Sequence, residues 1–448
     1  MRQESKLIRN LGFWDLMGLA IGQIIGAGIM SSTGVAIGMT GTGVALAFLL
    51  SPILTLIAIM PIAILGSAVP ATGGRYRYVS RLMGKNSGML YLLLHVTMNV
   101  MIATYALSFA SYFVSIVSGV NERLVAMIVL TLFFIANLIG TKSAAIINKV
   151  MDFALVGGLL LFIGFGLGKA DVAYVFNPAN MFEKGGVAFL ATLALLYSST
   201  SGAQCIAELG GEAKNPEKDI PRVLVLSTVF VGVFYVLISI VAAGVLPISE
   251  VANQPLSLVA RATMPKAAFY LFVIGAALGA TATTLNSTMT HITKPLLVAC
   301  DDGLLPSSFG VVSKNGVPWK ILTFFYVIGM IPLVSGFSLS FIAKFTTANS
   351  LLCQLLICAS LFMLVKNRPE LLKKSSMKIT PKSAMIIALT GGAVLCVLSY
   401  SLLLNLSVKV IAFLAVLILI VLVYSKTAIK DVVIPDDLTV DYTSNEQN

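Results

Sequence analysis

Long apolar segments follow one another along almost the whole chain, and they constrain its fold more than any other feature. A helix needs about 20 predominantly apolar residues to cross the hydrocarbon core of a bilayer. Twelve segments meet or approach that length: 13–37, 43–68, 88–118, 124–140, 145–168, 187–208, 222–246, 267–299, 318–336, 340–365, 383–404 and 408–425. We therefore predict an all-α polytopic membrane protein with 12 transmembrane helices.

Composition supports this prediction and excludes a soluble enzyme. Hydrophobic residues make up 58% of the 448 residues and charged residues only 11%, whereas soluble domains carry about 25% charged residues. We expect one transmembrane domain over residues 1–425 and a cytoplasmic, disordered tail over 426–448. The five cysteines lie in apolar stretches without metal-ligand spacing. We therefore expect no metal and no cofactor.

Basic residues fall mostly in loops on one side of the predicted membrane. Arg75, Arg77, Arg81 and Lys85 follow the second segment, and another basic group lies in 366–382. The opposite loops hold only Arg123, Lys169, Lys184, Arg261, Lys266 and Lys409. Cytoplasmic loops are the ones enriched in Lys and Arg. We expect both termini on the cytoplasmic side of the cell (inner) membrane, with the lipid bilayer as surroundings. The net charge of +11 is then a topology signal, and no nucleic-acid partner is expected.

Glycines cluster in the middle of the first segment, in the run Gly26-Ala27-Gly28-Ile29-Met30. Glycine costs about 1 kcal/mol relative to alanine in a helix interior. The cluster either allows another helix to approach closely or marks a break in the helix. At a break, free backbone N–H groups at the start of the second half-helix could hold a substrate carboxylate.

The sixth segment carries a matching polar patch, Tyr197-Ser198-Ser199-Thr200-Ser201-Gly202. Carbonyl groups freed at the end of its first half could accept hydrogen bonds from an ammonium group, although Ser and Thr often bond only to their own helix. Interruptions in the first and sixth helices are what a five-plus-five inverted repeat would produce. We place these repeats at about 11–168 and 187–365.

Four short motifs also resemble the amino acid–polyamine–organocation (APC) transporters, of the bacterial permease and antiporter type. They are Gly26–Met30, Pro70–Tyr78 with its Gly73-Gly74 pair, Lys214-Asn215-Pro216 followed by Ile220-Pro221-Arg222, and Asp302-Gly303-Leu304-Leu305-Pro306. The likeness runs over nearly the whole chain. It implies broken helices 1 and 6, with two extra C-terminal helices, at about 383–425, outside the repeats.

The resemblance implies further site residues. In arginine/agmatine antiporters of that family an Asn of helix 3 helps to bind substrate, and Asn99 matches it here; an Asn bonded between helices is the alternative. Their aromatic side chains fall at Ser198, or Tyr197 with a one-residue shift, and near Thr288. The aromatic box for a guanidinium is therefore largely missing. Gln204 and Leu155 replace a Glu and a Lys found in several members.

These arguments predict a substrate site between helices 1, 3, 6, 8 and 10. Its expected residues are Ile25, Gly26, Ala27, Gly28, Ile29, Met30, Asn99, Tyr197, Ser198, Ser199, Thr200, Ser201, Gly202 and Thr288.

The expected function is secondary active transport of an amino acid by alternating access, through exchange or proton symport. A small neutral substrate is favoured because no mid-membrane carboxylate is available to pair a cationic side chain. An acidic substrate, whose second carboxylate would pair with Lys344, and a cationic amino acid or polyamine remain alternative substrates. A transporter-like sensor that binds its ligand without carrying it remains the alternative function. His95, His291 and Asp152 are the candidate coupling residues, whereas Lys149 lies towards the cytoplasmic end of its segment, which argues against coupling by a lysine. A homodimer is left open.

Overall fold

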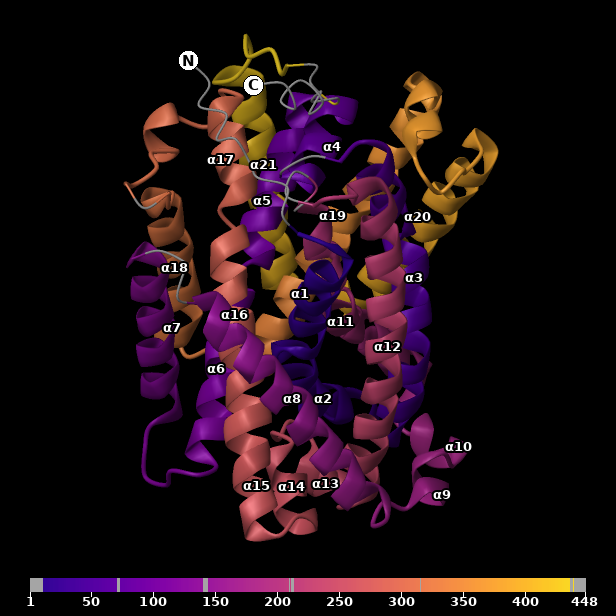
Figure 1. Cartoon of the computed structure of the whole chain (residues 1–448), viewed down its shortest axis with the longest axis vertical. Coiled ribbons are helices and arrows are strands. Elements are labelled where there is room, and N and C mark those ends of the chain that lie inside the picture. The colour runs from indigo at the N-terminus through magenta and orange to yellow at the C-terminus, as the bar shows by residue number, and fades with distance from the viewer. Residues whose placement is uncertain are drawn as a thin grey trace.

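The computed structural model describes residues 11–70, 73–139, 144–208, 210, 213–314, 316–435 and 438. Within these ranges every regular element is a helix, apart from one isolated bridge between Leu11 and Ala213. The longer helices run roughly side by side along the long axis of the molecule (Figure 1). This arrangement agrees with an all-α polytopic membrane protein.

The helices follow the apolar segments of the sequence. The first part holds α1 (Phe13–Ile25), α2 (Ala27–Thr40), η1 (Gly41–Gly43), α3 (Val44–Ala68), α4 (Gly74–Met83), α5 (Lys85–Met98), α6 (Met101–Val114), α7 (Glu122–Ile139) and α8 (Ala144–Leu167). The middle holds α9 (Val172–Val175), α10 (Pro178–Met181), α11 (Gly185–Thr200), the 3-10 helix η2 (Gly202–Glu208), α12 (Pro216–Gly244), α13 (Ile248–Val251) and α14 (Ser257–Thr263). The last part holds α15 (Lys266–Leu271), the π-helix η3 (Phe272–Leu278), α16 (Gly279–His291), α17 (Lys294–Asp301), η4 (Ser307–Phe309), α18 (Trp319–Val334), α19 (Leu339–Asn367), η5 (Pro369–Lys374), α20 (Pro381–Leu403) and α21 (Val408–Thr427).

Among the described residues, 9 helical stretches are long and apolar enough to cross a membrane, or up to 10 with the bent pair α11–η2. The two other predicted segments, 145–168 and 318–336, coincide with shorter apolar helices at Ala154–Leu167 and Trp319–Val334. The chain is therefore a multi-pass membrane protein. The count of twelve spans and the inverted repeat stay predictions.

Both predicted interruptions are observed. The backbone of Gly26 has a ψ of −129°, which ends α1 and starts α2, and α11 meets η2 at an angle of 44° around Ser201. The two breaks pack against each other. A Cβ at Gly28 would lie 3.1 Å from the Ser199 backbone, and one at Gly202 would lie 2.6 Å from the Gln23 carbonyl oxygen. Small residues thus allow α2 to approach α11 and α1 to approach η2.

One end of the molecule, at the top of Figure 1, carries α4 and is called the α4 end. Here Arg75 Nε lies 2.6 Å from Glu208 Oε1, and Arg81 pairs with Asp302 at 2.5 and 2.8 Å. The Tyr76 hydroxyl also donates to Asp302, at 2.9 Å. Burial and then the nearby Asp302 carboxylate raise the pKa of Tyr76, so this hydroxyl stays protonated. These bonds join α4 to η2 and to the loop after α17.

The segment that follows α21 also lies at the α4 end. The Lys85 ammonium donates to the carbonyl oxygens of Ile429 (3.0 Å), Lys430 and Val432 (3.3 Å). A Cβ at Gly303 would lie 3.8 Å from Val432 Cγ1. Ile429, Lys430 and Val432, which belong to the expected tail 426–448, therefore contact the turn between α4 and α5. Except for residue 438, the rest of that expected tail lies outside the described residues.

The opposite end, called the α13 end, carries α9, α10, α13 and α14 (Figure 1). The loop between α13 and α14 lies on α2, where the Asn253 N–H donates to the Gly34 carbonyl at 2.8 Å. The Tyr112 hydroxyl donates to the Met30 carbonyl at 3.1 Å and accepts from the Leu256 N–H at 3.2 Å. Tyr112 thus joins α6, α2 and this loop. The interior between the two helix breaks is therefore covered by side-chain and loop contacts at the α4 end and by the loop between α13 and α14 at the α13 end.

Candidate functional site

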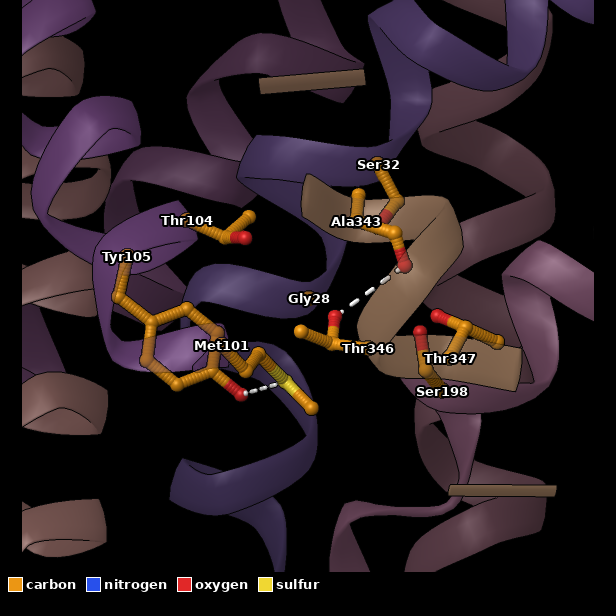
Figure 2. Close-up of a pocket in the computed structure, with 9 residues that line it drawn as sticks. All are labelled: Gly28, Ser32, Met101, Thr104, Tyr105, Ser198, Ala343, Thr346 and Thr347. Atoms are coloured by element: carbon orange, nitrogen blue, oxygen red, sulfur yellow. Dashed lines mark hydrogen bonds between the residues drawn. The ribbon is translucent and has the colours of Figure 1, made fainter. Parts of the chain in front are cut away.

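A small cavity lies where the second half of the first broken helix meets the first half of the sixth. Its volume is about 20 Å³, roughly enough for one water molecule. Helices α2, α6, α11 and α19 supply its lining (Figure 2). The lining residues are Gly28, Ser32, Met101, Thr104, Tyr105, Ser198, Ala343, Thr346 and Thr347.

The lining of this cavity is polar but uncharged. Five of its side chains carry Ser or Thr hydroxyls, Tyr105 adds a phenol, and Met101 and Ala343 are apolar. Hydroxyls both donate and accept hydrogen bonds. The lining can therefore bind polar groups of a ligand, but it offers no side-chain charge to neutralise an ionised side chain.

Backbone groups at the two helix breaks supply the remaining polarity. The first N–H groups of a helix have no partners within that helix and favour an anion. α2 begins at Ala27, beside the lining residue Gly28, and α11 ends two residues after the lining residue Ser198. The cavity therefore lies next to the start of one helix and the end of another.

Tyr235 of α12 connects the two breaks. Its side chain is fully buried, and its hydroxyl bonds to the carbonyl oxygen of Ile24 and lies 3.4 Å from that of Ser199. These carbonyls belong to the last turns of α1 and α11, where helical carbonyls lose their own partners. A single phenol thereby links both helix ends to α12.

The structure brings together several of the predicted residues of helix 1. Gly28 lines the cavity, and its carbonyl accepts a bond from Ser199 Oγ at 3.2 Å. Ile25, Ile29 and Met30 are buried in the hydrophobic core, and Gly26 forms the break. The side chain of Ala27 lies outside the described part of the structure.

The polar patch of helix 6 points in several directions. Only Ser198 among its members lines the cavity. The Tyr197 hydroxyl accepts a bond from Gln204 at 2.7 Å, and Thr200 Oγ1 lies 2.6 Å from Thr55 Oγ1 on α3. Ser201 ends α11 through its N–H, and Gly202 begins η2. Most of the patch therefore stabilises the break itself.

Asn99 and Thr288 do not line the cavity. The Asn99 side chain donates to the His95 carbonyl of its own helix at 2.7 Å. Thr288 Oγ1 lies 3.5 Å from Gln23 Nε2. Both residues stay predictions as substrate ligands. Met101, Thr104 and Tyr105 are the helix 3 residues at the cavity, and sequence reasoning missed them.

Two candidate coupling residues, His95 and His291, do not line the cavity. His95 Nε2 lies 2.9 Å from the Ile292 carbonyl oxygen, and His291 Nδ1 lies 2.9 Å from that of Ser287. Lys344 is partly exposed and follows the lining residue Ala343 on α19. The side chains of Lys149 and Asp152 lie outside the described part.

Comparison with known proteins identifies the family. A family model described as amino acid permease matches residues 11–428. The chain belongs to the amino acid permease family. This places the permease in the group that its four motifs predicted, and its all-helical fold is consistent with a multi-pass membrane transporter of that group.

Three curated relatives show how far this likeness defines the substrate. The permease is 28% identical to the branched-chain amino acid permease BcaP of Bacillus subtilis (strain 168), over 82% of this chain and 83% of that one. It is 26% identical to the methylthioribose transporter of the same organism, over 95% of each chain, and 29% identical to its serine/threonine exchanger SteT, over 56% and 58%. Relatives at similar identity thus carry three different substrate names. The substrate of this permease must be argued from its own cavity.

Proposed function

We propose that this permease is a secondary transporter that carries a small neutral amino acid by alternating access. The cavity between α2, α6, α11 and α19, which at about 20 Å³ must widen to hold an amino acid, marks its substrate site. The observation that carries the proposal is the uncharged, hydroxyl-rich lining at the meeting point of two broken helices. A zwitterion needs one anion site and one cation site, and the two breaks offer both in backbone groups.

Each charged group of the substrate has a proposed place. The N–H groups at the start of α2, from Ala27 to Met30, hold the carboxylate. Carbonyl groups at the end of α11, from Ser198 to Ser201, hold the ammonium. The substrate side chain then points to α6 and α19. Since neither helix places a carboxylate or a cation in the lining, a neutral side chain fits best.

Transport follows when one group of helices rocks against the rest around this site. The moving group is α1, α2, α3, α11, η2 and α12, which includes both breaks. The bonds of Arg75 and Arg81 close the α4 end, and the loop on α2 closes the α13 end. The α4 end faces the cytoplasm in this proposal, because the basic loops lie there.

A second candidate substrate is an acidic amino acid. Lys344 lies next to Ala343 on α19, and its long side chain could place the ammonium near the mouth of the cavity when the site opens. The two candidates differ in which compounds compete for uptake.

Uptake into proteoliposomes of the purified permease tests the proposal. Labelled alanine is offered to vesicles that hold either buffer or a mixed amino acid pool, with a tenfold excess of unlabelled glycine, serine, valine, glutamate or lysine outside. We expect uptake that the neutral compounds suppress. Competition by glutamate or lysine alone would refute a neutral substrate. Binding in detergent without uptake in any vesicle would indicate a sensor.

The two vesicle types also separate the coupling modes. Uptake that needs an internal pool indicates exchange. Uptake into empty vesicles that rises with an imposed proton gradient indicates symport, and substitutions at His95 and His291 would then be tested.

A further inference from the structure

The cavity contains one buried hydroxyl that the protein leaves unpaired. Thr104 is 2% exposed, and within the described structure its Oγ1 has no hydrogen-bond partner. Figure 2 shows this side chain on α6, with its hydroxyl directed towards the space near Gly28. An unpaired buried donor costs free energy, so buried polar groups of native proteins nearly always have a partner. A ligand in the cavity would supply one.

The neighbouring residue, Tyr105, also has hydrogen-bonding capacity that the protein leaves unused. The Tyr105 hydroxyl donates to the Met101 sulfur at 2.6 Å, and a thioether is a weak acceptor. Two other hydroxyls of the lining are better satisfied. Thr346 donates to the Ile342 carbonyl at 2.9 Å and Ser198 to the Leu195 carbonyl at 2.8 Å. Thr104 is thus the lining residue whose fully buried hydroxyl has no partner within the described structure, and Tyr105 beside it on α6 has only a weak one.

We propose that Thr104 and Tyr105 form a side-chain subsite that selects amino acids with a small hydroxyl side chain, serine and threonine. This subsite rests on the proposed function, which places the charged groups of the substrate at the two breaks. A substrate hydroxyl accepts from one of the two protein hydroxyls and donates to the other. Met101 and Ala343 limit the space beside it. A site built to bind a substrate hydroxyl rejects the analogue that lacks it, because its own polar groups then stay unpaired.

Threonine and valine are the matched pair of probes, since they share one shape and differ by a hydroxyl in place of a methyl. The measurement is the concentration of each that halves uptake of labelled alanine into proteoliposomes. We expect the wild type to prefer threonine by about tenfold or more, because a site that binds a substrate hydroxyl discriminates against the analogue that lacks it. Thr104→Val should remove most of this preference, and Thr104→Ser should keep it.

Ser108 provides a matched control one turn further along α6. It is 1% exposed and its hydroxyl is also unpaired in the described structure, but it does not line the cavity. Ser108→Ala should leave the threonine-to-valine ratio unchanged. Thr104→Val removes an unpaired hydroxyl and should not reduce stability. Tyr105→Phe, which loses its hydroxyl and keeps its ring, is a second variant that should lower the same ratio.

The outcomes separate this inference from the proposed function. Equal inhibition by threonine and valine in the wild type would overturn the subsite, as would an unchanged ratio in both Thr104→Val and Tyr105→Phe. In those cases labelled alanine still enters the vesicles, and the proposed function stands. Absence of uptake of any amino acid by the wild type would overturn the proposed function, and the subsite with it.

Discussion

Gly26 occupies a position where the structure leaves no room for a side chain. A Cβ there would lie 1.5 Å from Thr284 Oγ1 and 2.8 Å from Thr284 Cβ, on α16. Atoms cannot approach so closely, so any substitution must displace the Thr284 side chain from its place against the break. Gly18 lies two turns earlier in the same broken helix, and a Cβ there would meet nothing within 4 Å.

This difference gives a prediction at the scale of one residue. Gly26→Ala should lower alanine uptake by about tenfold, because overpacking of this kind costs roughly 1–3 kcal/mol. Gly18→Ala should transport normally. The measurement is initial uptake rate per molecule in proteoliposomes, with membrane insertion checked by fractionation. Wild-type rates in Gly26→Leu would contradict the role of this close contact.

Residue-level detail also marks the limit of prediction from sequence. The run Tyr197–Gly202 was recognisable because its polarity interrupts an apolar segment. Which member faces the cavity was not, because successive helical side chains point about 100° apart. Ser198 faces the cavity, whereas Thr200 faces α3. Thr104 looks in the sequence like any threonine that bonds to its own helix. Only the packed structure shows that its hydroxyl has no such bond.

At the scale of elements, α12 holds the broken helices in register. Tyr235 provides this link through the carbonyls of Ile24 and Ser199. The breaks were predictable, since glycine and polar residues inside apolar spans are costly. The tyrosine was not, since a single Tyr in a long apolar helix gives no signal of its partner. Pairings between helices depend on tertiary packing, which local sequence does not encode.

Tyr235→Phe tests this link. Loss of the hydroxyl leaves the Ile24 carbonyl without this donor, which should reduce stability by about 1–3 kcal/mol and also slow uptake. Tyr326→Phe is a suitable comparison, because the Tyr326 hydroxyl lies 3.0 Å from Thr131 Oγ1, between α18 and α7 and away from the breaks. Thermal melting in detergent should fall in both variants. An equal fall in uptake in both would contradict a specific role for Tyr235.

At the scale of the whole molecule, buried ion pairs fasten the α4 end. The side chains of Arg81 and Asp302 are only 1% and 5% exposed. Removal of one partner from such a pair costs about 3–5 kcal/mol, because the other charge stays buried. These bonds connect α4, from the Gly73-Gly74 motif, to the Asp302 loop. Two of the four motifs that carried the family resemblance therefore meet in space, since Tyr76 of the Pro70–Tyr78 motif also donates to Asp302.

Asp302→Asn should shift the permease towards a form that is open at the α4 end. Cys205, which is partly buried in η2 at this end, serves as a native reporter. We expect faster labelling of Cys205 by a small thiol reagent in Asp302→Asn, measured by peptide mass spectrometry. Lys320→Gln, which removes an exposed bond to the Ser308 carbonyl and a contact with the Trp319 ring, should leave the rate unchanged. Equal rates of Cys205 labelling in Asp302→Asn and wild type would show that the Arg81–Asp302 ion pair does not hold the α4 end closed.

The hydrogen bonds from Lys85 to the carbonyls of Ile429, Lys430 and Val432 have a practical consequence for labelling the protein. A fluorescent reporter or affinity handle joined directly after Thr427 would replace the three carbonyls that the Lys85 ammonium binds. The turn between α4 and α5 would lose its anchor beside the Asp302 loop. A reporter joined after residue 448 keeps these hydrogen bonds. The fusion point therefore decides whether the labelled permease keeps the native structure at the α4 end.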